Sequence, residues 1–347
     1  MKHLFLFLAM VAASVSCEKE AQTREAASEG IIRLTIEPGG PESRTDIPDI
    51  STQNHETAIR KVDILVFDEQ GRLNLHHAAG TSVSDIQFSV STGQKEIWAV
   101  INGPDLGSVL RLTNLKTMRT LLEDNVVNGN GRGFIMAGSQ SCTVTPAAEG
   151  NRCTVTVSRL AARVALTRLS VNLPSAYKNV RIDHVMLINV VANQNLSGTE
   201  NPSIWYNKKG LAESGSVIDG SAGREAECPS LTFRTAGTVV QNRSSLPLDT
   251  PWYFYGYANP TVLDSAGSDG PFHAEKTRLV VCAEIDGRTY YYPVTLPSFD
   301  RNTAYEVELT IEGLGTDRPD ILPEKRSVST AVAIRPWQPG SVLTENI

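Results

Sequence analysis

The sequence is poor in the residues that catalytic and metal sites usually require. Its 347 residues include six histidines and five cysteines, without a CxxC pair, an HExxH motif or a GxSxG nucleophile elbow. The usual signatures of zinc sites, metalloproteases and hydrolases are therefore missing. His76 and His77 are neighbours on a predicted strand and should point to opposite faces. We therefore predict no enzyme activity, no metal site and no cofactor.

Positive charge is not concentrated anywhere in the chain. Thirty-two Lys and Arg residues are opposed by 38 Asp and Glu residues, for a net charge of −6. A nucleic-acid partner is not expected, because phosphate binding needs clustered basic residues. The hydrophobic fraction of 41% over 347 residues is enough for a buried core and, by length, for two domains.

Long apolar runs are absent apart from one at the N-terminus. The run from Leu4 to Ala13 follows a positively charged start and is too short for a transmembrane helix, which needs roughly 20 apolar residues. It has the length of a secretory signal core. The run continues through Ser14 and Ser16 to Cys17, like a bacterial lipobox in which Ser14 replaces the usual leucine. We expect residues 1–16 to be a lipoprotein signal peptide and Cys17 to carry the lipid anchor; the alternative is a plain signal peptide with an incidental cysteine.

Strand patterns dominate the remaining sequence. Residues 17–30 are polar and predict a tether, and IIRLTIEP (31–38) predicts the first strand. KVDILVFD alternates apolar and polar residues, and IDGRTYYY predicts a hairpin with a DG turn. Leucines recur at mostly helical intervals over residues 106–124, which predicts one or two short helices. The fold class is therefore all-β, with two tandem β-sandwich domains at 31–158 and 159–347.

Cysteines and aromatic residues leave two interpretations open. Cys142 and Cys153 flank a predicted hairpin, so a cross-strand disulfide is a candidate in an exported protein. Cys282 lies in an apolar strand and is expected to be a small buried hydrophobe. The aromatic run over residues 252–257 is typical of a strand with one face in the core, and the alternative is a sugar-binding platform.

The two ends of the chain carry the functional prediction. The first strand is followed by a loop that contains Arg44, and a cut there would free that strand and leave an unpaired apolar groove. Near the C-terminus, SVSTAVAIRPW alternates and should weaken its pairing at the proline. Its predicted donor face is made of Val328, Thr330, Val332 and Ile334. Donation of this strand to a neighbour's groove would join subunits head to tail into a filament.

Several stretches in order resemble the FimA-type fimbrillins, the lipoprotein-precursor pilins of Bacteroidales that form type V pili. These stretches are SCEKE, KVDILVFDEQGRL, IWAVINGPDL, GFIMAGS, SRLAARVALTRL, the aromatic strand into YAN, GRTYYYPVTL, RNTAYEVELTIEGLG and AIRPW. The resemblance runs from Cys17 to about Trp337. It implies two transthyretin-like β-sandwich domains and a role as a pilus subunit for adhesion.

The resemblance also implies a maturation route. The precursor would reach the outer membrane surface with lipid (palmitate) on Cys17, and an arginine-specific protease would cut after Arg44, so that the mature chain begins at Thr45. Strand exchange would then polymerise the subunits into a fimbrium. The implied partners are other pilus subunits, the outer membrane, the protease and host or microbial surface receptors. Two alternatives remain: a non-polymerising anchor or tip subunit, and a glycan-binding surface lipoprotein.

Overall fold

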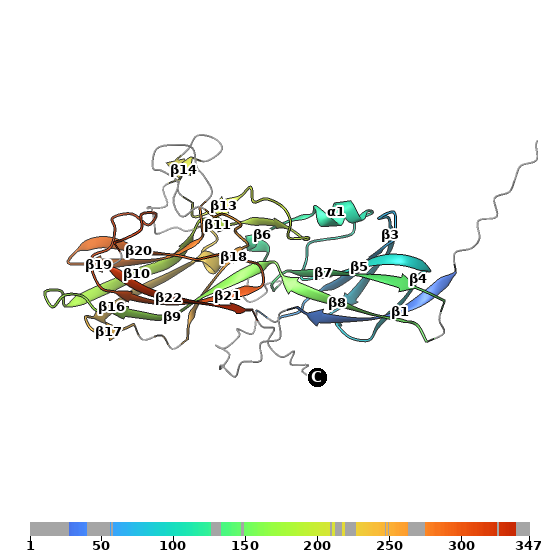
Figure 1. Cartoon of the computed structure of the whole chain (residues 1–347), viewed down its shortest axis with the longest axis horizontal. Coiled ribbons are helices and arrows are strands. Elements are labelled where there is room, and N and C mark those ends of the chain that lie inside the picture. The colour runs from blue at the N-terminus through green and yellow to red at the C-terminus, as the bar shows by residue number, and fades with distance from the viewer. Residues whose placement is uncertain are drawn as a thin grey trace, which may run out of the picture.

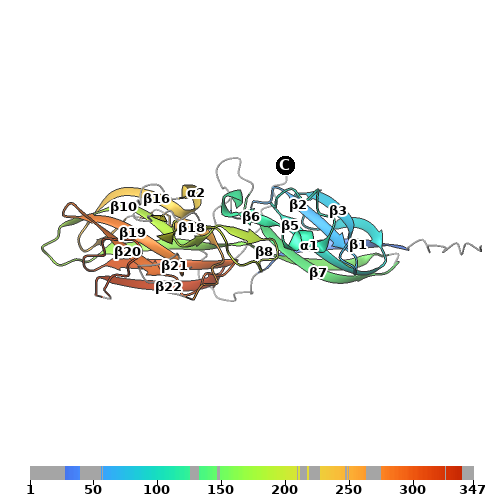
Figure 2. The same cartoon turned by 90° about the horizontal axis from the view of Figure 1, so that it is seen from above.

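A computed structural model of the chain describes residues 28–39, 56, 58–125, 133–146, 149–208, 210–211, 217–218, 227–246, 248, 250–262, 275–324 and 326–337. Two β-sandwiches lie end to end along the long axis of the molecule (Figures 1 and 2). Within the described residues, no helix has the length and hydropathy needed to cross a membrane.

The first sandwich contains the elements from β1 to β8. They are β1 (Glu29–Pro38), β2 (Val62–Phe67), β3 (Leu73–Gly80), β4 (Ile86–Ser91), β5 (Gly93–Ile101), α1 (Leu112–Lys116), β6 (Arg119–Leu121), the 3₁₀ turn η2 (Leu122–Asn125), β7 (Met136–Val144) and β8 (Asn151–Arg159). The strand order is β3-β2-β5-β7-β8-β1-β4. Strands β7 and β8 are paired only at two positions near one end. The sheet therefore folds at this corner into two layers, β3-β2-β5-β7 and β8-β1-β4, around a shared apolar core.

The second sandwich begins at β9, directly after Leu160. Its elements are β9 (Ala161–Val171), β10 (Asn179–Ile188), β11 (Val190–Val191), β12 (Asn193–Asn195), β13 (Trp205–Tyr206), β14 (Gly210–Leu211), β15 (Val217–Ile218), α2 (Pro229–Thr232), β16 (Phe233–Gln241), β17 (Ser244–Ser245), β18 (Trp252–Tyr257), β19 (Arg278–Ile285), β20 (Arg288–Thr295), β21 (Thr303–Ile311) and β22 (Val328–Pro336). One layer has the order β16-β10-β19-β20, and the other has the order β13-β11-β18-β9-β21-β22. The largest core cluster lies between these layers and extends to the first domain through Phe134 and Leu160.

The predicted all-β class is confirmed. The alternation expected of KVDILVFD is not, because all six residues of β2 are buried. The DG turn joins β19 to β20 with Asp286 and Gly287 at φ +50° and +76°, as a tight hairpin turn of the primed type requires. The one or two short helices predicted over 106–124 are confirmed as α1 and η2, which β6 separates. The short helix α2 in the second domain was not predicted. The aromatic run forms β18, where Trp252, Phe254, Tyr255 and Tyr257 are buried in the core, so these four side chains do not form a sugar platform.

The predicted elements at the two ends also exist, with shifted bounds. The first strand begins at Glu29 rather than at residue 31, so it takes in the last residues of the predicted tether. The C-terminal strand ends at Pro336, where the sequence predicted that pairing would weaken. Strand β8 ends at Arg159 and β9 begins at Ala161, so the connection between the sandwiches lies beside the predicted boundary between residues 158 and 159.

Candidate assembly site

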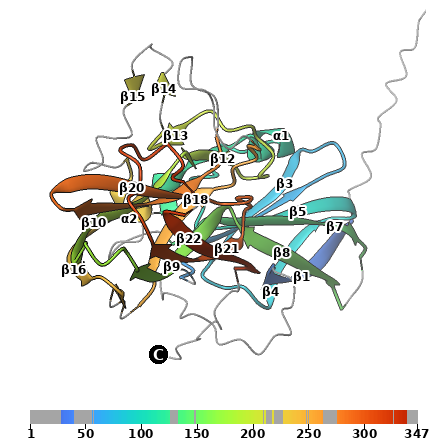
Figure 3. The same cartoon turned by 60° about the vertical axis from the view of Figure 1, so that its left-hand side comes forward.

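Strand β1 occupies an interior position in its layer. It pairs in parallel with β8 and antiparallel with β4 (Figure 3). Every second side chain points into the core, and Ile32, Leu34 and Ile36 are 0%, 0% and 5% exposed. The alternation comes directly from the sequence IIRLTIEP, in which apolar residues recur with the period of a strand.

Burial of these three side chains is energetically large. Full burial of one aliphatic side chain is worth about 1.5–3 kcal/mol, so the three together contribute about 5–9 kcal/mol. This is comparable to the net stability of a typical domain, about 5–15 kcal/mol. A first domain without β1 would thus expose a long apolar groove with two unpaired strand edges, those of β8 and β4.

The groove has a steric requirement at the N-terminal end of β1. A Cβ atom on Gly30 would lie 2.4 Å from the carbonyl oxygen of Thr145 and 2.7 Å from Cγ1 of Val144. Only a residue without a side chain fits there unless the β7–β8 turn moves. Any strand that replaces β1 therefore needs apolar residues at alternate positions and a small residue, or none, at this end.

Strand β22 lies at the edge of its sheet and has β21 as its partner strand. The ladder runs from Thr303 opposite Pro336 to Ile311 opposite Val328. The structure places the predicted donor face on this strand but does not bury it evenly. Val328 and Val332 are half-buried against the core, whereas Thr330 and Ile334 are exposed, and Ile334 is 49% exposed. The strand is therefore held mainly by backbone hydrogen bonds to one neighbour.

Trp337 follows β22 immediately and is fully buried where the two sandwiches meet. Its backbone N–H donates to the carbonyl oxygen of Asn302 at 2.9 Å. The indole packs against Phe134 of the first domain and Tyr255 of the second, with ring centroids 5.1 and 5.7 Å apart. The guanidinium of Arg159 lies 4.5 Å from the indole centroid. Trp337 is therefore the buried anchor at the end of a strand that is otherwise mostly exposed.

A buried carboxylate completes this junction. Glu56 is 0% exposed, and its Oε2 accepts from Nη1 of Arg163 at 2.8 Å and from Nε1 of Trp337 at 3.2 Å. Its Oε1 accepts from the Tyr255 hydroxyl at 2.7 Å, and its backbone carbonyl accepts from the Arg159 guanidinium at 3.0 Å. Burial, and then the neighbouring Glu56 carboxylate, raise the pKa of Tyr255 well above its usual value. Burial likewise lowers the pKa of Arg159 to about 10.

This polar junction joins segments that are distant in the sequence. Glu56 belongs to the connection between β1 and β2, the two arginines lie at the end of β8 and in β9, and Trp337 follows β22. No role at this junction was predicted from the sequence for any of these residues. A signal was present in SRLAARVAL, because two arginines in an otherwise apolar strand need a buried acidic partner.

Three of the predicted site residues lie outside the described residues: Cys17, Arg44 and Thr45. The candidate disulfide pair is described. Cys142 and Cys153 lie on β7 and β8, and both thiols are free in this structure. Burial, and then the neighbouring Cys142, raise the pKa of Cys153 to about 12, so its thiol is protonated at neutral pH. Their oxidation to a disulfide stays a prediction.

A family comparison identifies the first domain. Residues 32–173 match the model of the family named major fimbrial subunit protein (FimA). Over these residues, which run from β1 through β9, the chain is similar to the FimA family. The match begins within β1, at residue 32, and spans the position of Arg44. The resemblance to FimA-type fimbrillins is thereby confirmed, and the family is one of fimbrial subunits rather than of enzymes.

Solved structures extend the likeness to the second domain. A fimbrilin (FimA) of Porphyromonas gingivalis is 16% identical, with a TM-score of 0.61 over 88% of this chain and 97% of that chain. A proposed cell adhesion protein of Bacteroides eggerthii is 16% identical, with a TM-score of 0.62 over 90% and 97% of the two chains. The tip fimbrial protein Mfa3 of P. gingivalis is 13% identical, with a TM-score of 0.52 over 89% and 100%. At these identities the likeness shows the fold of FimA-type proteins. No curated protein sequence matches the chain.

Proposed function

We propose that this chain is a structural subunit of a surface fimbrium that assembles by strand exchange and serves adhesion. Export with residues 1–16 as the signal and lipid on Cys17 would bring the precursor to the outer membrane surface. An arginine-specific protease would then cut after Arg44, leaving a mature chain that begins at Thr45. The fimbrial family of the first domain supports this proposal.

The position of β1 between β8 and β4 is the observation that carries the proposal. Strand β1 fills an interior position, yet nothing but the segment containing Arg44 links it covalently to the rest of the domain. After cleavage it would be held by noncovalent contacts alone. Its loss would open the groove between β8 and β4. An open groove is unfavourable in water, because the backbone groups of both strand edges would be unpaired and apolar side chains would be exposed.

Strand β22 of a second copy is the proposed occupant of that groove. It has nine residues against the ten of β1, so the two strands span similar lengths. Val328, Thr330, Val332 and Ile334 alternate in the same way as the buried side chains of β1, and with Val328 in the place of Ile32 the strand begins after the Gly30 position. Because the groove is in the first domain and the donor strand in the second, the contact is head to tail and does not close, which produces a filament.

The anchor or tip alternative shares the fold and differs in processing. Such a subunit would keep β1 in place, as this structure shows it, and would end a filament rather than extend it. Trp337 is fully buried within its own chain, and this favours the alternative, because donation of β22 would require the indole to leave its buried site.

Replacement of the arginine tests the proposal. In cells that express Arg44→Ala, we expect a surface precursor that retains β1 and yields no filaments by electron microscopy. The matched control is Arg24→Ala, upstream of β1, which should assemble normally. Filaments of normal length from Arg44→Ala would show that removal of β1 by cleavage at this residue is not required.

A further inference from the structure

The outer face of the layer β16-β10-β19-β20 carries a group of side chains that assembly does not use. The register of β10 with both of its neighbours shifts between Ile182 and His184, which marks a β-bulge. Ile182 and Val185 both point into the main core. The two residues between them, Asp183 and His184, are thereby placed together on the outer face, where a regular strand would have put them on opposite faces.

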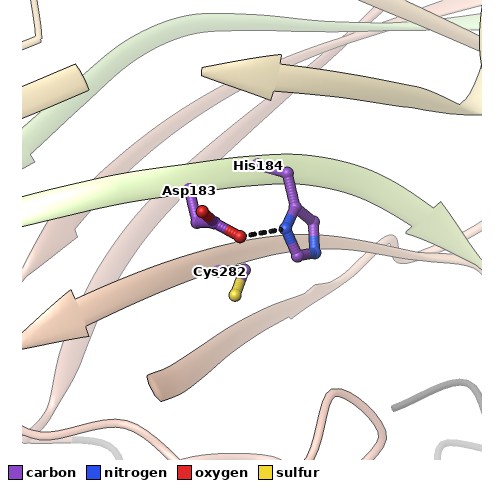
Figure 4. A group of neighbouring side chains, drawn as sticks. All are labelled: Asp183, His184 and Cys282. Carbon is purple, nitrogen blue, oxygen red and sulfur yellow. Dashed lines mark hydrogen bonds and ion pairs between the residues drawn. The ribbon is translucent and has the colours of Figure 1, made fainter. Parts of the chain in front are cut away.

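A third donor comes from the neighbouring strand. Cys282 of β19 is the register partner of His184. One donor atom from each residue, a carboxylate oxygen, an imidazole nitrogen and the thiol sulfur, lies within 4.8 Å of the other two. Figure 4 shows the Asp183 carboxylate directed at the imidazole, with Nδ1 and Oδ2 3.0 Å apart, and the sulfur of Cys282 below them.

The surroundings hold these donors in position. The imidazole stacks on Phe233 with a centroid distance of 4.9 Å. His184 is 3% and Cys282 1% exposed, and the cysteine packs in an apolar cluster with Met186 and Val280. The Asp183 side chain is 25% exposed, which gives access from solvent. Its second oxygen, Oδ1, accepts from Nη1 of Arg181 at 3.1 Å, so Oδ2 is the oxygen turned to the cluster.

We propose that Asp183, His184 and Cys282 bind one Zn²⁺ ion, with water from the Asp183 side as the fourth ligand. Thiolate, imidazole and carboxylate are the three donor types that zinc uses in proteins, and a thiolate disfavours the hard cations Mg²⁺ and Ca²⁺. Two donors on a tetrahedral zinc lie about 3.3–3.7 Å apart, so a separation of 4.8 Å has to shorten by about 1.1–1.5 Å. Rotation of the partly exposed Asp183 carboxylate, together with small shifts of the other two side chains, would supply that change.

Coordination has defined consequences for this chain. The ion replaces the hydrogen bond between Asp183 and His184, and the Cys282 thiol releases its proton to solvent when it becomes a ligand. The ion joins β10 to β19 on the outside of the second domain. Because it binds the folded chain, it stabilises the domain by mass action. Periodicity alone could not predict such a site, since only the bulge brings Asp183 and His184 to one face.

Metal binding by the full chain tests the proposal. After dialysis with equimolar ZnCl₂ and gel filtration, we expect mass spectrometry of the metal content to find about one zinc per chain. Cys282→Ser and Asp183→Asn should each lower zinc affinity by about tenfold or more. The matched control is Cys153→Ser, which removes another buried cysteine and should leave zinc binding unchanged.

Cobalt supplies a readout that does not depend on how the variants fold. The unmodified chain with Co²⁺ should show a thiolate-to-cobalt charge-transfer band and the intense visible bands of tetrahedral cobalt. A chain that retains no zinc, or a cobalt spectrum without the thiolate band, would overturn the proposal and leave Cys282 as a small buried hydrophobe beside a hydrogen-bonded Asp–His pair.

Discussion

Strands β1 and β22 have similar lengths and the same alternation of apolar residues, yet they differ in their position in the sheet and in the number of partner strands. Strand β1 is interior, paired on both sides, and its three inward side chains are nearly inaccessible to water. Strand β22 is an edge strand with one partner and leaves Ile334 49% exposed. The comparison teaches that burial comes from the neighbours rather than from the strand's own pattern. A strand like β22 would bury its apolar face fully only in an interior position like that of β1, with a partner strand on each side.

Introduction of a charge on the donor face should have the largest effect on assembly. Ile334→Asp alters an exposed side chain, so the free energy of unfolding of the monomer should change by less than about 0.5 kcal/mol. An aspartate in the apolar groove of a neighbour would be buried without a partner. We therefore expect folded, processed subunits that form no filaments by negative-stain electron microscopy.

The opposite face of the same strand provides the control for this variant. Ala333→Asp places the same charge on an exposed neighbouring residue of β22. This variant should assemble, because its side chain would point out of the groove. Equal assembly of the two variants would mean that β22 is not the strand that enters the groove. The proposed replacement of β1 by β22 would then be wrong.

Removal of the indole at the end of β22 should have the largest effect on stability. Trp337→Ala removes a fully buried side chain at the junction, so we expect a loss of about 3–5 kcal/mol in the free energy of unfolding. Ile334→Ala, three residues earlier, should cost less than about 1 kcal/mol because that side chain is half in water. Urea denaturation of the unpolymerised chain measures both. Similar losses for the two variants would show that the strand, and not Trp337, holds the C-terminal segment.

A smaller effect is expected from neutralising the junction carboxylate. Glu56→Gln keeps the size of the side chain but leaves Arg163 without its charged partner, which should cost about 2–3 kcal/mol. Glu308→Gln, on the exposed side of β21, is the matched control and should change the free energy of unfolding by less than about 0.5 kcal/mol. An equally small change for Glu56→Gln would mean that the buried ion pair contributes nothing beyond its desolvation penalty.

The features that sequence could predict are those set by local pattern. The alternation in IIRLTIEP and SVSTAVAIRPW predicted β1 and β22, and the DG pair predicted the β19–β20 turn. The leucine spacing over 106–124 predicted one or two short helices, and it predicted no more than α1 and η2 because the path between them is not helical. Leu115 and Leu122 are buried by a largely irregular path, whereas Leu110 is 69% exposed, so the leucine spacing did not reflect one helical face.

Features that depend on distant partners could not be predicted in this way. Glu56 and Trp337 are 281 residues apart and meet only because the two sandwiches lie end to end. The bulge at Asp183 changes which face a side chain occupies, and the sequence IDHVM, without glycine or proline, does not predict it. Above all, the interior position of β1 depends on its parallel pairing with β8, a strand that follows more than 100 residues later in the chain.

The N-terminus of the subunit within isolated surface filaments tests the central claim most directly. Mass spectrometry of the N-terminal peptide should find a chain that begins at Thr45, without β1 and without lipid. That result would mean that the groove between β8 and β4 is vacated and refilled by another strand. Filaments made of chains that begin at an acylated Cys17, with β1 still attached, would contradict assembly by strand exchange into this groove.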